Sequence, residues 1–161
     1  MRIDKNKINK VCVICSGLKG DLFMKIPLIE AIKKDMPWVS ISAVVDENNV
    51  NVLINHPDIT EVLPHSRDKK NKIKYLINTF KNIHELRKRK FDLTINFYSG
   101  GISNLLVRLT NARYRIGFNH IKALRIANNI LIDLPDMHSN HWTFCLAKLL
   151  EPLGIEPSSV T

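Results

Sequence analysis

The stretch that decides the fold reads VCVICSGLKGD and spans Val11 to Asp21. Its first five residues form an apolar run typical of a buried strand, and a loop with two glycines follows directly. Apolar side chains then recur at helical spacing: Leu22, Ile26, Ile29, Ile32 and Met36. The stretch therefore predicts a strand, a glycine loop and a helix, in which Pro27 either bends the helix or marks a late start.

The same alternation continues along the chain. Further strands are predicted at Val39–Val45, Ile59–Leu63, Phe91–Phe97, Tyr114–Gly117 and Ile130–Ile132. Helices are predicted at Asn51–Asn55, Asp68–Lys90, Ile102–Leu109 and His138–Leu153, the last of them capped by Gly154. The pattern predicts an α/β fold with a doubly wound, mainly parallel sheet. We expect residues 1–155 to form one Rossmann-like domain and residues 156–161 to begin a linker.

Sheets of this kind bind ligands at the carboxyl ends of their strands, near the point where the strand order reverses. This rule predicts that the loops Ser16–Asp21 and Tyr98–Gly101 lie side by side at the site. The first loop has neither the G-x-G-x-x-G pattern nor the G-K-[ST] ending of common nucleotide sites. Asp21 has two interpretations that stay open here: a cap at the start of the helix, or a general base that faces the cleft.

Composition narrows the class of protein. The 161 residues carry a net charge of +9, which indicates an anionic partner or surface. No apolar run approaches the roughly 20 residues of a membrane span, and no signal peptide is evident at the N-terminus, so a cytoplasmic location is predicted.

Cys12 and Cys15 should point to opposite faces of one strand, which predicts buried thiols and no shared metal ion. His138 and His141 lack further ligands at metal spacing, so capping or surface roles are expected.

One helical stretch concentrates the positive charge: Lys69, Lys70, Lys72, Lys74, Lys81, Arg87, Lys88, Arg89 and Lys90. It is either a solvated helix face or an electrostatic dock for an anionic lipid headgroup. Binding to nucleic acid is not favoured, because the stretch offers few aromatic side chains for stacking and no nucleic-acid motif is visible. Arg113 and Arg115 are expected to be structural.

Several segments, taken in order, resemble lipopolysaccharide heptosyltransferases. They begin with Ser16–Asp21 and Pro27–Lys33, continue through His56–Ile59 and Val62–Pro64, and resume at Phe91–Asn96, Asn111–Phe118, His141 and Leu149–Ile155. The resemblance covers nearly the whole chain, and it depends on the order and spacing of these segments, since a Gly-Asp pair alone is common.

The resemblance implies a two-domain glycosyltransferase of the B type, of which this chain is the acceptor-side half and would be inactive alone. It implies that Asp21 is the base of an inverting transfer that needs no metal or other cofactor. The donor, with ADP-heptose as first expectation, would be bound by a C-terminal domain that this chain does not contain. The expected acceptor is an anionic glycolipid of the lipopolysaccharide core, reached at the cytoplasmic face of the inner membrane. The acceptor-binding residues are expected to be Ser16, Gly17, Lys19, Gly20, Arg67, Lys69, Lys70, Tyr98, Ser99 and Gly100.

The chain departs from the family pattern at several positions. Lys19 stands where an apolar residue is usual, and Asn96–Ser99 replaces an Asp followed by a Gln-Gly pair. Ile102 replaces a commonly basic residue, and Phe144 falls where a Glu is common. A second hypothesis is therefore a non-catalytic module that binds an anionic glycan or a partner chain.

Overall fold

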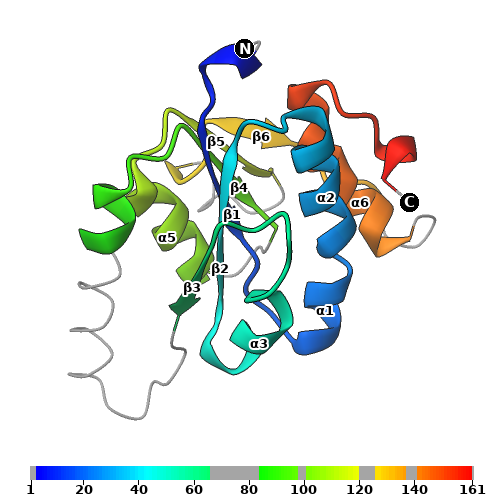
Figure 1. The fold of residues 1–161 in the computed structure, drawn as a ribbon. Helices are drawn as coiled ribbons and strands as arrows, with labels where there is room; N and C mark the ends of the chain where they lie inside the picture. The colour runs from blue at the N-terminus through cyan, green and yellow to red at the C-terminus, as the bar shows by residue number, and fades with distance from the viewer. Residues whose placement is uncertain (1–2, 66–83, 98–100, 120–125, 137–140, 161) are drawn as a thin grey trace.

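A computed structural model describes residues 3–65, 84–97, 101–119, 126–136 and 141–160. Its centre is a six-stranded sheet with the order β3-β2-β1-β4-β5-β6, in which every pairing is parallel (Figure 1). The strands are β1 Lys10–Ile14, β2 Ser40–Asp46, β3 Glu61–His65, β4 Leu93–Asn96, β5 Tyr114–Phe118 and β6 Ile130–Ile132. The order runs outward from β1 in one direction and from β4 in the other, so the predicted doubly wound α/β fold is confirmed.

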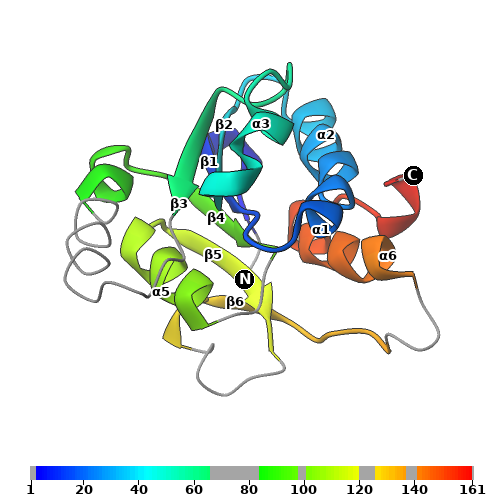
Figure 2. The ribbon, with the colours of Figure 1, turned by 90° about the horizontal axis from the view of Figure 1, so that it is seen from below.

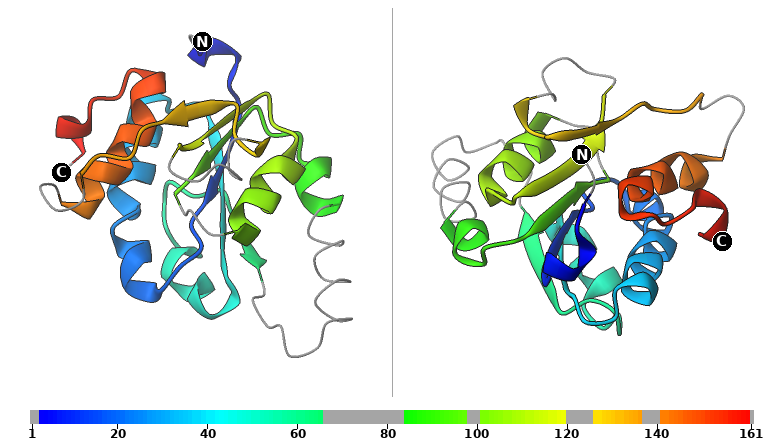
Figure 3. Two further views of the ribbon diagram at one scale, coloured as in Figure 1. Left: turned by 180° about the vertical axis from the view of Figure 1, so that it is seen from behind. Right: turned by 90° about the horizontal axis from the view of Figure 1, so that it is seen from above.

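Helices cover both faces of the sheet. They are α1 Lys19–Phe23, α2 Ile26–Asp35, α3 Val50–Leu53, α5 Gly101–Thr110 and α6 Trp142–Ala147, and residues 84–88 are also helical. Short 3-10 turns occupy Lys5–Lys7 (η1), Glu47–Asn49 (η2), Lys148–Leu153 (η4) and Pro157–Ser159 (η5). The helices α2 and α6 lie on one side of the sheet and α5 on the other, as the views from below and from behind also show (Figures 2 and 3).

The core is correspondingly divided by the sheet into two apolar layers. Alternate residues of β1 point to opposite layers, because side chains alternate along a strand. Cys15 packs in the layer under α2 and α6, whereas Cys12 packs in the layer under α5. Both are buried free thiols, as predicted.

The proline of the first helix separates two helices. The first, α1, ends at Phe23, and Pro27 lies in the first positions of α2, where a missing N–H costs nothing. Of the two possibilities that Pro27 left open, a bend or a late start, the structure shows the late start of α2.

Other boundaries differ from the prediction. The third strand begins at Glu61 and not at Ile59, because the Ile59 amide turns back to bond the carbonyl of His56. The last helix is shorter than predicted: α6 starts after the cap His141 and gives way to a 3-10 segment at Lys148. Gly154 caps that segment with a φ of 74°, as expected. Of the helix predicted at 68–90, residues 84–88 are helical and 66–83 lie outside the described part.

Candidate functional site

The loop after β1 lies where the strand order reverses, between β1 and β4. Gly17 has a φ of +140°, a conformation that disfavours any side chain. Its amide donates a hydrogen bond to Asp46 Oδ2 at 2.9 Å, and its carbonyl accepts one from Asn49 Nδ2 at 3.0 Å. Asp46 ends β2 and Asn49 ends η2, so the loop is fastened to the neighbouring strand and its turn.

Asp21 is the third residue of α1 and is half-buried. Its Oδ2 accepts a hydrogen bond from the amide of Leu18 at 3.2 Å, which satisfies one of the unpaired donors at the start of the helix. Within the described part of the chain no hydrogen bond engages the other oxygen, Oδ1. The side chain therefore caps α1 with one oxygen and leaves the second available, so the two interpretations of Asp21 are compatible.

Lys25 is a member of the site that the sequence analysis missed. Its side chain is only 1% exposed, although lysine usually reaches solvent. Its Nζ donates a hydrogen bond to the carbonyl of Ser16 at 2.8 Å. A signal was present in the sequence, because Lys25 occupies a helical position three residues after the buried Leu22 and four before the buried Ile29.

The predicted site residues fall into two groups. Ser16 and Gly17 are buried in the loop, and Lys19 and Gly20 are exposed on α1. The remaining ones, Arg67, Lys69, Lys70, Tyr98, Ser99 and Gly100, lie outside the described residues. The structure does bring the ends of β1 and β4 together, since Ile14 pairs with Asn96 and the amide of Phe97 bonds the carbonyl of Ile14 at 3.1 Å.

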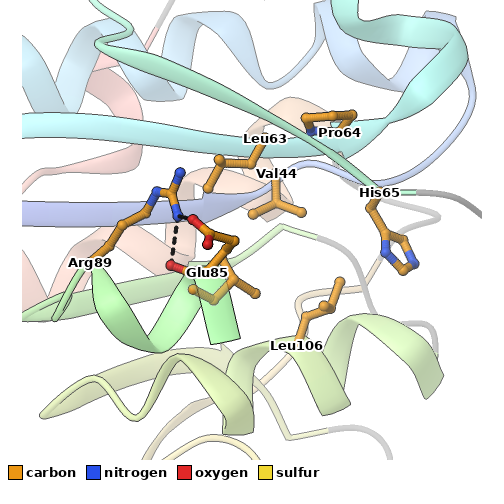
Figure 4. Close-up of a pocket in the computed structure, with 8 residues that line it drawn as sticks. Val44, Leu63, Pro64, His65, Glu85, Arg89 and Leu106 are labelled. Atoms are coloured by element: carbon orange, nitrogen blue, oxygen red, sulfur yellow. Dashed lines mark hydrogen bonds and ion pairs between the residues drawn. The ribbon is translucent and has the colours of Figure 1, made fainter. Parts of the chain in front are cut away.

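A pocket of about 180 Å³ lies on the α5 side of the sheet (Figure 4). Apolar side chains from β2, β3, α5 and the 84–88 helix line most of it, and His65, Glu85 and Arg89 complete it. Arg89 binds Glu61 through two hydrogen bonds of 2.7 and 2.6 Å and also contacts Glu85. Arg89 is thus a structural ion-pair residue, whereas its neighbours Arg87, Lys88 and Lys90 are exposed.

Two further polar residues singled out in the sequence, His141 and Arg115, have structural contacts, and His138 lies outside the described residues. His141 caps α6, because its Nδ1 accepts a hydrogen bond from the amide of Thr143 at 3.3 Å. Arg115 donates to the carbonyls of Ala127 and Ala112. Both roles were predicted, and neither residue belongs to the loop after β1.

The sequence and the fold of the chain were compared with those of known proteins. No family model matches the chain. Lipopolysaccharide heptosyltransferase 3 of Escherichia coli is 25% identical over 138 residues, which cover 85% of this chain. The chain is thus similar in sequence to a heptosyltransferase. It spans 41% of the length of that relative.

Solved structures show the same fold. A family 9 glycosyl transferase from Veillonella parvula superposes with a TM-score of 0.78 at 23% identity, over 91% of this chain and 41% of its own. The E. coli heptosyltransferase WaaC, solved with ADP-2-deoxy-2-fluoro heptose, gives 0.76 at 16% identity, over 92% of this chain and 49% of its own. E. coli heptosyltransferase II gives 0.75 at 18% identity, over 94% and 44%. The predicted resemblance to a glycosyltransferase domain of the B type is thereby confirmed at the level of the fold.

Proposed function

We propose that this chain is the acceptor-binding half of an inverting glycosyltransferase that moves a heptose-type sugar onto a lipopolysaccharide core acceptor. One observation carries the proposal. The Asp21 carboxylate, which uses only Oδ2 to cap α1, lies where the strand order of the doubly wound sheet reverses. The chain that carries it resembles lipopolysaccharide heptosyltransferase 3 over 85% of its length. Ligands of such sheets bind at that point.

Asp21 is the general base of the proposed reaction. Its Oδ1 accepts the proton of an acceptor hydroxyl while that oxygen attacks the anomeric carbon of the donor sugar. The bond from the anomeric carbon to the acceptor oxygen forms as the bond to the nucleotide diphosphate breaks, and the diphosphate leaves with its electron pair. A positioned base contributes about 10²–10⁴-fold to such a step.

The donor is proposed to bind elsewhere in the whole protein. WaaC was solved with an ADP-heptose analogue, and ADP-heptose is therefore our first choice of donor. Because this chain spans less than half of each of these structures, we assign the donor to a second domain, supplied in cis or in trans. The proposed transfer requires no metal and no other cofactor.

The proposed acceptor is an anionic glycolipid, which places the protein at the cytoplasmic face of the inner membrane as a peripheral protein. The net charge of +9 and the exposed Arg87, Lys88 and Lys90 support this location. Cations near an anionic surface contribute about 1 kcal/mol each. No helix in the described part of the chain has the length and apolar character to cross a membrane.

Binding by the chain itself tests the assignment of its role. The isotope-labelled chain is titrated with phosphorylated lipopolysaccharide core oligosaccharide and, separately, with ADP-heptose, while amide resonances are followed by NMR. We expect the oligosaccharide to shift the amides of Gly17, Leu18 and Asp21, and ADP-heptose to leave them unchanged.

A matched pair of variants completes this test. Lys19→Ala, which removes an exposed cation beside Asp21, should weaken oligosaccharide binding, and Lys34→Ala, which removes an exposed cation on α2, should not. Absence of any response to the oligosaccharide, or a response of these amides to ADP-heptose alone, would overturn the proposal in favour of another binding role.

A further inference from the structure

Three charged side chains converge on Gly17. Asp46 Oδ2 lies 2.9 Å from its amide nitrogen. A Cβ built on Gly17 would meet Asp21 Oδ2 at 3.2 Å and Lys25 Nζ at 3.4 Å. The three groups come from different elements: Asp46 from the end of β2, Asp21 from α1 and Lys25 from the start of α2. A Cβ at this position would be tight against Asp21, and the φ of +140° independently disfavours a side chain.

The burial of Lys25 indicates that its ammonium group has a specific task. Removing an ammonium from water costs several kcal/mol unless hydrogen bonds and opposite charges compensate it. The long stem would allow Lys25 to reach solvent, yet Nζ points inward to the carbonyl of Ser16. The charge of Lys25 affects a neighbouring group. Burial raises the pKa of the Cys15 thiol to about 12, and the positive charge of Lys25 acts in the opposite direction.

We infer that Lys25 is a positioning residue for Asp21, which acts by fixing the Ser16–Gly17 turn on which the carboxylate rests. The ammonium holds the Ser16 carbonyl and lies beside the space next to Gly17 into which Asp21 Oδ2 also points. Because Oδ2 is bonded to the Leu18 amide, the turn that Lys25 fixes also fixes the carboxylate, and Oδ1 is left to take the proton. The inference rests on the proposed function, since it gives Lys25 its role through the base.

The α2 helix offers a matched control for Lys25. Lys33 also donates its Nζ to a backbone carbonyl, that of Val39 at 2.7 Å, but at the opposite end of the helix. Replacing either lysine by methionine removes one hydrogen bond of the same kind and keeps an unbranched side chain that is shorter by the terminal nitrogen alone. Of the two lysines, Lys25 is the one that bonds the turn preceding Asp21.

The experiment compares Lys25→Met and Lys33→Met in the whole protein encoded by the gene, by steady-state transfer from ADP-heptose to core acceptor. We expect Lys25→Met to lower kcat by about 10²-fold, the loss that follows a misplaced catalytic group, with the KM of the donor unchanged. Lys33→Met should leave both constants unchanged. If Lys25→Met does not fold, as judged by circular dichroism, Lys25→Gln replaces it, because it removes the charge and shortens the reach to Ser16.

Two outcomes would overturn the inference. One is an unchanged kcat in the folded Lys25 variant, and the other is an equal loss of kcat in Lys33→Met. The double variant Lys25→Met with Asp21→Asn tests whether Lys25 acts through Asp21. If Lys25 acts through the base, the double variant should be no slower than Asp21→Asn alone. If Asp21→Asn itself transfers at the wild-type rate, the proposed function fails and not the role of Lys25 alone.

Discussion

The amide nitrogen of Gly17 lies 2.9 Å from Asp46 Oδ2, so the loop that carries the proposed base is fastened to the neighbouring strand by a charge-assisted hydrogen bond. Gly17 makes this bond with a φ of +140°, a conformation that favours glycine. The conformation of one glycine thus links the end of β2 to the position of Asp21.

Gly17→Ala is expected to destabilise the protein. The alanine would hold a strained backbone and would place its Cβ 3.2 Å from Asp21 Oδ2, and strain of this kind costs about 1–3 kcal/mol. The control is Gly20→Ala, because a Cβ at Gly20 meets nothing within 4 Å and Gly20 lies in a helix. Urea denaturation measures both, and equal stability of the two variants would contradict this account of the loop.

Much of the fold could be predicted from the sequence, because strands of a parallel sheet are apolar runs and its helices carry an apolar stripe. The alternation of these patterns led to the doubly wound sheet, and Pro27 marked the start of α2. Boundaries were predicted less well where local hydrogen bonds compete with the apolar pattern. At Ile59 a turn to His56 delays the third strand, and at Lys148 an α-helix tightens into a 3-10 segment.

The site could be predicted only in part. Asp21 and its glycine loop were found because loop residues after a strand stand out in the sequence. Asp46, Asn49 and Lys25 were missed, because their importance depends on contacts with Gly17 and Ser16 that only the folded chain shows. A polar residue directly after a strand, and a lysine inside an apolar stripe, are the signals that could have indicated them.

The ion pair between Glu61 and Arg89 is expected to make stability depend on pH. The hydrogen bonds from Arg89 lower the pKa of Glu61 below its ordinary value of 4.5. The contribution of the pair is therefore complete above that value and is lost as the pH falls through the lowered folded-state pKa. Because the Glu61 side chain is 40% exposed, we expect Glu61→Gln to cost only about 1 kcal/mol at neutral pH.

The measurement is urea denaturation of wild type and Glu61→Gln at neutral and at strongly acid pH. The difference between the two proteins should disappear in acid. Glu151→Gln is the control, since Glu151 pairs with Lys148 three residues away and such pairs contribute about 0.2–0.5 kcal/mol. A difference for Glu61→Gln that persists or grows in acid would show that the pair is not its source.

The three cysteines are expected to be inert in the folded protein. Burial raises the pKa of Cys12 and Cys145 and raises that of Cys15 to about 12, so reactive thiolate is scarce. An aromatic disulfide reagent should find no rapidly reacting thiol in the native chain and three after unfolding in guanidinium. Rapid reaction of Cys12 or Cys15 in the native chain would contradict the burial of these thiols.

Binding to lipid vesicles tests the proposed membrane contact. The chain should bind vesicles that contain anionic lipid and should not bind neutral ones. Joint replacement of the exposed Arg87, Lys88 and Lys90 by glutamine should weaken binding by about 1 kcal/mol per cation. Arg89 is retained because Glu61 and Glu85 already pair with it. Equal binding to both kinds of vesicle would contradict electrostatic docking on anionic lipid.

The most direct measurement is the rate of heptose transfer by Asp21→Asn in the whole protein. Asparagine keeps the shape of the side chain but cannot take the proton of the acceptor hydroxyl. We predict a fall in kcat of about 10²–10⁴-fold, with acceptor binding by the chain unchanged. A variant that transfers heptose at the wild-type rate would contradict the assignment of Asp21 as the base.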